Sequence, residues 1–157
     1  INYNGSELIM DIKQLQKEIA EDEGIKLEVY NDHLGLPTCG IGHLILEQDA
    51  EYGRALGTEI TQERCDELFE QDINSVLLDC KKLYEDFHQL PEEVQHIIAN
   101  MMFNMGYPRL SKFKKMRQAI IDGDWFEASV QMQDSKWYKQ VPNRANRLID
   151  RMKNLSD

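Results

Sequence analysis

The residues best suited to chemistry in this sequence are two acids and a hydroxyl near its start, Glu23, Asp32 and Thr38. Glycoside hydrolysis needs one carboxylic acid to protonate the leaving oxygen and a second carboxylate that activates water or attacks the sugar. The two acids also need different environments, because one must stay protonated near neutral pH while the other is ionised. Glu23 precedes an apolar segment and Asp32 lies in a polar turn, so the pair is typical of a carboxylate-based glycosidase.

The same acids also have a purely structural interpretation. The chain contains 28 acidic residues, so two of them at suitable spacing are not in themselves unusual. Glu23 fits the solvated last turn of a helix, and Asp32 is a common turn-forming residue. On residue types alone this structural interpretation is the more frequent one, and the catalytic hypothesis needs support from the rest of the chain.

Local signals arrange these residues around a helix end and a hairpin. Apolar residues recur at helical spacing over residues 6–22, with Ser6 suited to the N-cap, and a glycine directly after Glu23 ends the helix. Two strands are expected next, over about 25–30 and 36–42, with a bend between them. Glu23 would then lie at the helix end and Asp32 at the hairpin turn.

The remainder of the chain is predicted to be helical. Residues 45–60 are acidic and weakly patterned, so we expect a mostly irregular connection there. Thr61 is suited to cap a long helix over about 61–80. Further helices are expected from Pro91 to Gly106, over 110–121, after Asp124, after Ser135 and from Pro142 onward.

These elements predict an α+β fold in one domain, residues 1–157. Its parts would be a β-containing lobe over about 24–60, a bridging helix over about 61–80, and a helical lobe made of 1–23 plus 81–157.

Composition excludes several classes of function. The net charge is −10, which argues against nucleic acid as a partner. Residues 1–80 carry 18 acids and 5 bases, whereas residues 81–157 carry 10 acids and 13 bases, so the positive charge is concentrated in the second half. No apolar run reaches the roughly 18 residues of a membrane span. The chain begins at Ile1, so we expect it to be processed or cut from a longer polypeptide.

Cysteine and histidine usage predicts neither a metal nor a cofactor. Cys39, Cys65 and Cys80 are odd in number and lack metal-ligand spacing, so we interpret them as free thiols of a protein folded in a reducing compartment. The four histidines are scattered and form no recognised metal-binding array.

Six motifs occur in a fixed order along most of the chain. They are D-E-G at 22–24, L-x-V-Y-x-D at 27–32, P-T-x-G-I-G-H-L at 37–44, L-F-x-Q-D at 68–72, N-M-x-F-x-M-G at 100–106 and W-Y-x-Q-x-P-N-R-A-x-R at 137–147. In these motifs and their order the chain resembles the lysozymes of T-even bacteriophages, a family of phage-type muramidases. Six ordered matches make coincidence negligible.

The resemblance implies an enzyme that hydrolyses the β-1,4 bond between N-acetylmuramic acid and N-acetylglucosamine in peptidoglycan. It implies Glu23 as the general acid, Asp32 as the base or electrostatic partner, and Thr38 as the hydroxyl that holds the attacking water. The family acts with inversion, which requires room for a water between the sugar and the second carboxylate. The implied fold is lysozyme-like, with a small β-hairpin lobe joined by a long helix to a larger all-helical lobe.

The resemblance also assigns supporting roles. It implies that Arg144 lies against Glu23 and Arg147 against Asp22, and that His43 is a structural residue paired with Asp72 rather than a catalytic one. The implied substrate-binding residues are Gly42, Leu44, Phe103, Asn104 and Lys136.

Two departures from the family pattern stand beside the active-site segment. Leu34 occupies a usually acidic position associated with substrate contact, and Cys39 replaces a branched aliphatic residue. The alternatives to an active muramidase are a peptidoglycan-binding relative with weakened catalysis and a structural domain of a phage particle. We expect a monomer unless the chain is part of a larger phage protein, made in the host cytoplasm and acting in the periplasm, or carried on the phage particle.

Overall fold

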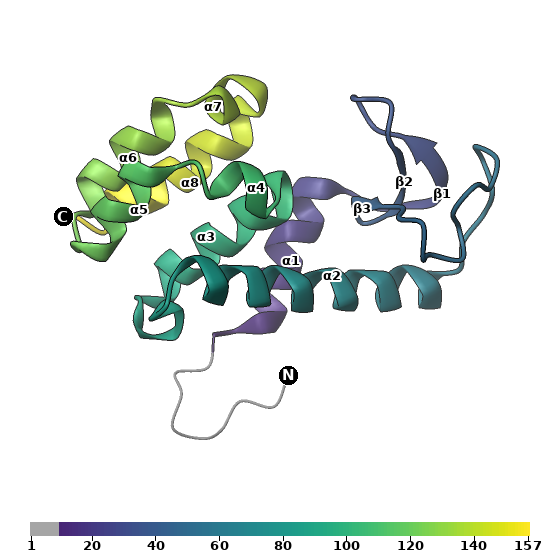
Figure 1. The fold of residues 1–157 in the computed structure, drawn as a ribbon, viewed down its shortest axis with the longest axis horizontal. Helices are drawn as coiled ribbons and strands as arrows, with labels where there is room; N and C mark the ends of the chain where they lie inside the picture. Colours follow the sequence, from purple (N-terminus) through teal and green to yellow (C-terminus); the bar gives the residue numbers. More distant parts are fainter. Residues whose placement is uncertain (1–9) are drawn as a thin grey trace. The chain divides into compact units, whose positions relative to one another are not determined.

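The computed structural model describes residues 10–157, and Figure 1 shows the order of its elements. The strands are β1 (Lys26–Asn31), β2 (Pro37–Gly40) and β3 (His43–Leu44). The helices are α1 (Ile12–Glu23), α2 (Gln62–Leu83), α3 (Glu92–Met105), α4 (Tyr107–Leu110), α5 (Lys114–Ile121), α6 (Trp125–Gln133), α7 (Lys136–Gln140) and α8 (Pro142–Asn154), with a 3-10 turn at Phe87–Gln89. The predicted α+β class is confirmed.

The described residues form two compact units. One consists of residues 12–75, and the other of residues 10–11 and 76–157, so the division falls inside α2. No helix among residues 10–157 is long and apolar enough to cross a membrane.

The unit of residues 12–75 begins with α1. Leu15 and Ile19, one helical turn apart, are fully buried and anchor its inner face. The helix ends as predicted, because Gly24 adopts a left-handed φ of 73° and its N–H donates to Ala20 O at 2.8 Å. Residues 10 and 11 are not helical, so α1 begins at Ile12 and the prediction of one continuous helix over residues 6–22 is wrong at these two residues. The predicted cap, Ser6, lies outside the described residues.

A three-stranded antiparallel sheet in the order β1-β2-β3 follows α1. Tyr30 pairs with Thr38 across β1 and β2, and Thr38 pairs with Leu44 across β2 and β3. The second predicted strand is shorter than expected, and a turn at 41–42 separates it from the unpredicted β3. A small core lies against this sheet, made of Val29, Cys39, Ile45 and Leu68 with Ile60 packed beside them.

The connection over 45–61 contains no helix, as predicted, but backbone and side-chain bonds hold it in place. Its last part bonds to β1, with Gly57 N donating to Val29 O at 2.7 Å and Ile60 N donating to Leu27 O at 3.1 Å. Its middle is held by Glu51, which accepts from Arg64 Nε at 2.6 Å and from Arg64 Nη2 at 3.1 Å. This two-pronged ion pair fixes the connection to the start of α2.

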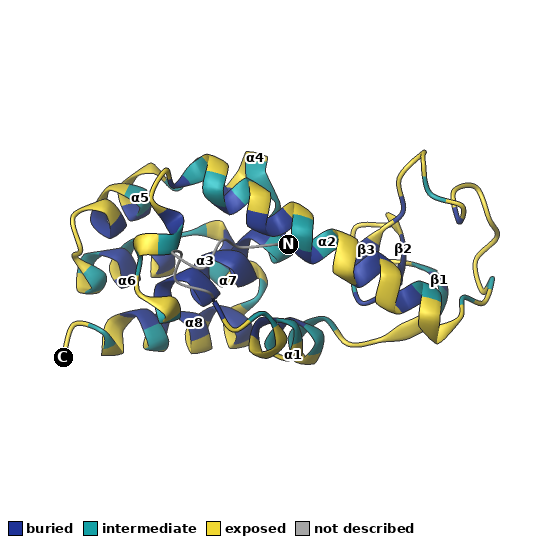
Figure 2. Cartoon of the chain, turned by 90° about the horizontal axis from the view of Figure 1, so that it is seen from below, coloured by how far each residue is buried: buried dark blue, intermediate teal, exposed yellow. Residues whose placement is uncertain are grey.

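The unit that contains residues 76–157 is built around α3, most of which is buried (Figure 2). Helices α5, α6 and α8 bury one side each, and α6 packs against both α5 and α8. Their caps follow the sequence signals. Asp124 accepts from Glu127 N at 3.0 Å, Ser135 accepts from Tyr138 N at 3.1 Å, and Pro142 begins α8.

The predicted single helix over 110–121 is wrong. The chain forms two helices here, α4 and α5, because residues 111–113 leave the helical path. Ser111 Oγ donates back to Pro108 O at 2.9 Å, and Phe113 has φ −77° and ψ 61°, outside the helical range. The spacing of the apolar residues Leu110, Phe113 and Met116 is compatible with one continuous helix. It is equally compatible with two short helices separated by a break.

Candidate active site

Glu23 is the last residue of α1 and is half-buried. Its carboxyl group lies directly against Gly42, in the turn between β2 and β3. A Cβ atom placed on Gly42 would be 3.0 Å from Glu23 Cδ and 3.1 Å from each carboxyl oxygen. Gly42 also has a left-handed φ of 59°, so both its conformation and the space beside it favour glycine. The absence of a side chain at residue 42 therefore leaves room for the acid.

Asp32 begins the turn between β1 and β2. Its Oδ1 accepts from Leu34 N at 2.8 Å and from Leu36 N at 2.9 Å, which fixes the carboxylate on its own turn. Both bonds are accepted by Oδ1, so Oδ2 takes part in neither of them. The Leu34 side chain is 68% exposed, and its backbone helps to orient Asp32.

Thr38 is buried in β2, next to this turn. Its hydroxyl donates to Leu36 O at 2.9 Å, so the same residue, Leu36, contacts both Asp32 and Thr38. Because the hydroxyl proton is committed to a carbonyl, Thr38 Oγ1 is left to act as an acceptor. A water molecule can therefore donate one hydrogen to Thr38 and its other hydrogen to a carboxylate.

The charges of both acids affect the pKa of Tyr30. Burial raises the pKa of its phenol, and the nearby charges of Glu23 and then Asp32 raise it further. Both carboxylates thus act on one side chain, which pairs with Thr38 in the sheet. Tyr30 therefore stays neutral near neutral pH. Tyr30 is not among the predicted site residues, although it lies inside the L-x-V-Y-x-D motif two residues before Asp32.

His43 is buried in β3 and is held on both sides of its ring. Nδ1 lies 2.7 Å from Asp72 Oδ2, and Nε2 lies 2.8 Å from Asp49 Oδ2. Burial alone would lower the pKa of His43, but the hydrogen bonds to Asp72 and Asp49 outweigh it and raise the pKa above its usual value. Asp49 also accepts from Leu46 N at 2.8 Å, so His43 connects β3, the 45–61 connection and α2. The contact of His43 with Asp72 is the one that the family resemblance implies, whereas its contact with Asp49 was not predicted.

The remaining predicted residues lie in the unit of residues 76–157. Arg144 is buried in α8 and its Nε donates to Asn100 Oδ1 on α3 at 2.8 Å. Arg147, on the same helix, is exposed. The expected pairs Arg144 with Glu23 and Arg147 with Asp22 join residues of the two units, and they stay predictions.

Asn104 and Trp137 form a hydrogen bond inside that unit. Trp137 is buried, and its indole Nε1 donates to Asn104 Oδ1 at 2.8 Å. This bond fixes the amide, so that its NH2 group faces away from the indole. Phe103 precedes Asn104 and is half-buried, and Lys136 precedes Trp137 and is exposed.

Leu44 is exposed and pairs with Thr38 across the sheet, so the two side chains share one face. Among residues 10–157, no group of His, Cys, Asp and Glu is arranged to hold a metal ion. The cysteines are buried, and burial raises the pKa of the Cys39 thiol to about 11, so this thiol stays protonated near neutral pH.

The family model for phage lysozyme matches residues 20–154, a range that includes every predicted site residue. The chain belongs to the phage lysozyme family.

The relatives of this chain differ in length. "Probable T4-type lysozyme 2" of Dictyostelium discoideum is 34% identical over 158 residues, which cover 88% of this chain and 92% of that protein. Pre-baseplate central spike protein Gp5 of Enterobacteria phage T4 is 34% identical over 148 residues, 83% of this chain but 26% of the spike protein. Peptidoglycan hydrolase gp36 of Pseudomonas phage phiKMV is 33% identical over 147 residues, 92% of this chain and 16% of gp36.

Proposed function

We propose that this protein is a glycoside hydrolase that cleaves the β-1,4 bond between N-acetylmuramic acid and N-acetylglucosamine in bacterial peptidoglycan. Membership of the phage lysozyme family supports this activity, and one relative is named as a peptidoglycan hydrolase. The observation that carries the assignment to particular residues is the single turn that fixes both Asp32 and Thr38 through Leu36. That turn stands in the same unit as Glu23 and Gly42.

In this mechanism Glu23 is the general acid. Its carboxyl proton passes to the glycosidic oxygen as the bond between that oxygen and C1 of the muramic acid breaks. The contact with Gly42 limits where the carboxyl group can lie. A positioned acid of this kind contributes on the order of 10²–10⁴ in rate.

Asp32 and Thr38 prepare the water that attacks C1. The water donates one hydrogen to Thr38 Oγ1, whose own proton is given to Leu36 O, and its other hydrogen to the Asp32 carboxylate. As the oxygen of the water bonds to C1, the second proton moves to Asp32, so that charge and atoms balance. Attack from the face opposite the leaving group inverts the anomeric configuration.

The experiment that tests the stereochemistry is anomer-resolved proton NMR of the first products. Short peptidoglycan oligosaccharides should give the α-anomer of the new reducing end before mutarotation mixes the anomers. An initial β-anomer would contradict the water-activating role of Asp32 and Thr38, because it requires a retaining mechanism.

Two biological settings fit the proposed activity. A free lysis enzyme would be made in the host cytoplasm and act on peptidoglycan in the periplasm, whereas a tail-associated lysozyme would be carried on the phage particle. The match to about a quarter of a spike protein supports the second setting. The match to nearly all of a T4-type lysozyme of Dictyostelium discoideum supports a stand-alone enzyme, as the first setting requires.

A further inference from the structure

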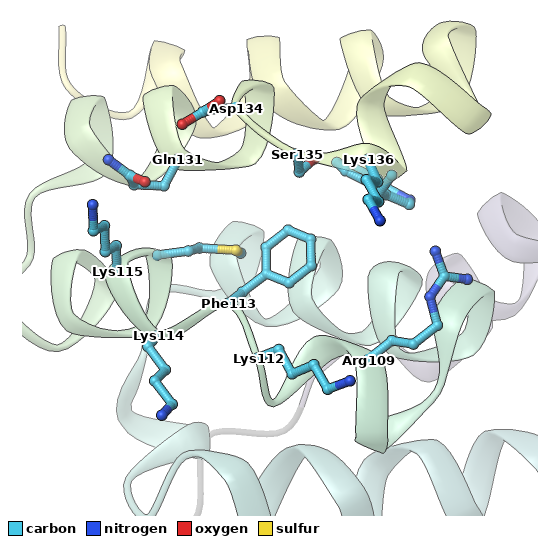
Figure 3. A pocket seen from close by; sticks show the side chains of 11 residues that line it. Arg109, Lys112, Phe113, Lys114, Lys115, Gln131, Asp134, Ser135 and Lys136 are labelled. Atoms are coloured by element: carbon cyan, nitrogen blue, oxygen red, sulfur yellow. The ribbon is translucent and has the colours of Figure 1, made fainter.

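Hydrogen-bond donors are plentiful in the unit of residues 76–157. Figure 3 shows Arg109, Lys112 and Lys136 among the side chains that line a pocket of about 600 Å³ there. The family resemblance implies Lys136 for substrate binding, so this pocket is best explained as part of the proposed substrate site. The catalytic residues proposed above belong to the other unit, residues 12–75, which carries 15 acids and 5 bases.

The proposed catalytic groups mostly accept hydrogen bonds from a bound sugar. The Asp32 carboxylate can only accept, and Thr38 Oγ1 is left as an acceptor because its proton goes to Leu36 O. The one carboxyl proton of Glu23 passes to the leaving oxygen. The hydroxyl groups of a sugar can donate to such acceptors, whereas an N-acetyl carbonyl oxygen can only accept. N-acetylmuramic acid carries this carbonyl on C2, next to the carbon that the water attacks, so a donor is needed beside Thr38.

Tyr30 offers such a donor on the same face of the sheet. It pairs directly with Thr38 across β1 and β2, and directly opposed residues of an antiparallel pair project from one face. The Tyr30 side chain is half-buried, and no group among residues 10–157 is hydrogen-bonded to its hydroxyl. The hydroxyl oxygen is not a fully buried atom either, so a bound ligand can reach it.

The surroundings of Tyr30 leave its hydroxyl as the group that meets a ligand. Burial raises the pKa of the phenol, and the charges of Glu23 and Asp32 raise it further, so the phenol keeps the proton that it would donate. Lys26 Nζ lies 4.7 Å from the centre of the Tyr30 ring and covers one ring face, where a sugar therefore cannot stack. Lys26 also lies 3.8 Å from Glu28 Oε1, so this lysine already has two contacts within the protein.

We propose that Tyr30 is a specificity-determining residue that donates a hydrogen bond to the N-acetyl carbonyl oxygen of the muramic acid unit whose C1 is attacked. This bond orients the sugar relative to the water held by Asp32 and Thr38. The inference rests on the proposed function, from which it takes the substrate and the point of attack. It adds the substrate group that the sheet recognises.

The test uses two synthetic tetrasaccharides in which N-acetylglucosamine and N-acetylmuramic acid alternate. In the second, the internal muramic acid unit carries a hydroxyl on C2 in place of the N-acetyl group, which removes the carbonyl oxygen. We expect Tyr30→Phe to lower kcat/KM at least about fivefold for the acetylated substrate, because its carbonyl is left without a donor. For the hydroxyl analogue the loss should be less than about twofold. Comparing the two losses isolates the interaction of Tyr30 with the N-acetyl group.

Phenylalanine at residue 30 is a mild replacement. It keeps the ring and its contact with Lys26, and it removes a hydroxyl that has no partner among residues 10–157, so the melting temperature should not change. Tyr52→Phe is the matched control, because Tyr52 is exposed in the 45–61 connection and its hydroxyl should affect neither substrate. If circular dichroism shows that Tyr30→Phe does not fold, Tyr30→Leu repeats the comparison.

Binding without turnover gives a second readout. Glu23→Gln should hydrolyse neither tetrasaccharide, so calorimetry with this variant measures their dissociation constants. Adding Tyr30→Phe to it should weaken binding of the acetylated tetrasaccharide at least about fivefold and leave binding of the hydroxyl analogue unchanged. A merely structural role of Tyr30 would weaken both.

The outcomes separate this inference from the proposed function. A wild-type protein that cleaves neither tetrasaccharide would overturn the proposed function, and with it the inference. A wild-type protein that cleaves the acetylated tetrasaccharide, together with an equal effect of Tyr30→Phe on both substrates or no effect on either, would overturn the inference about Tyr30 alone.

Discussion

Gly42→Ala is the substitution that most directly tests how Glu23 is positioned. A Cβ atom at residue 42 would lie 3.0 Å from Glu23 Cδ and 3.1 Å from both carboxyl oxygens. These contacts are shorter than ordinary van der Waals separations for carbon, which are about 3.5–4.0 Å. The Glu23 carboxyl group must therefore shift by several tenths of an ångström or more, or the turn must move.

Two separable effects follow from this substitution. The left-handed φ of 59° at Gly42 costs alanine about 1–2 kcal/mol of folding free energy. The displaced acid additionally lowers kcat, because a misplacement of about 1 Å can cost roughly 10²-fold in rate. If residue 42 acts by leaving room for Glu23, the loss should appear in kcat rather than in KM. A rise in KM would instead support the substrate contact that the family resemblance implies for Gly42.

Gly53→Ala is the matched control. Gly53 has a similar φ of 77°, and a Cβ atom there would meet nothing within 4 Å. Urea denaturation should show a comparable loss of stability in both variants, and steady-state hydrolysis of solubilised peptidoglycan should show a loss of kcat only in Gly42→Ala. If Gly42→Ala hydrolysed the substrate as fast as Gly53→Ala, the proposal that residue 42 positions Glu23 would be wrong.

Two ion pairs give further predictions that concern stability and pH. Asp72 and Asp49 raise the folded-state pKa of His43, so the protonated ring stabilises the fold. This stabilisation is fully present below the unfolded pKa of about 6.5 and is lost as pH rises through the folded pKa. In urea denaturation, Asp49→Asn should therefore lower the free energy of unfolding by about 1.5–3 kcal/mol at pH 5 and by clearly less at pH 9. An equal loss at both pH values would contradict the charged pairing. The hydrogen bond from Arg64 lowers the pKa of Glu51, so that pair stabilises the fold above the unfolded pKa of Glu51 and loses its effect as pH falls through the folded pKa. Arg64→Met should lower the free energy of unfolding, measured by urea denaturation, by about 1.5–3 kcal/mol at pH 7 and by much less near pH 3. A loss that does not depend on pH would contradict the ion pair and indicate lost packing instead.

The parts of the fold that local chemistry determines could be predicted from the sequence. Asp124, Ser135 and Pro142 each mark a helix start, because capping depends on one side chain and the next three residues. Gly24 and Gly106 likewise mark helix ends. The break between α4 and α5 could not be predicted from apolar spacing, because Leu110 and Met116 are buried in either arrangement.

Contacts made where the chain folds back on an earlier element were harder to predict. Asp49 reaches His43 only because the 45–61 connection turns back, and no periodicity indicates that return. His43 with Asp72 was named from family resemblance rather than from spacing, since the two residues are 29 positions apart. The contact between Gly42 and Glu23 depends on the turn at 41–42, which the prediction of a continuous strand over 36–42 did not contain.

The central claim, that Glu23 is the general acid, is tested most directly by the hydrolysis rate of purified peptidoglycan with Glu23→Gln beside Glu21→Gln. Both replacements remove one acid from α1, and Glu21 is exposed, so the second variant controls for charge. Glu23→Gln should lose on the order of 10²–10⁴ in rate with an unchanged melting temperature, while Glu21→Gln keeps its activity. A Glu23→Gln variant as active as Glu21→Gln would contradict the account.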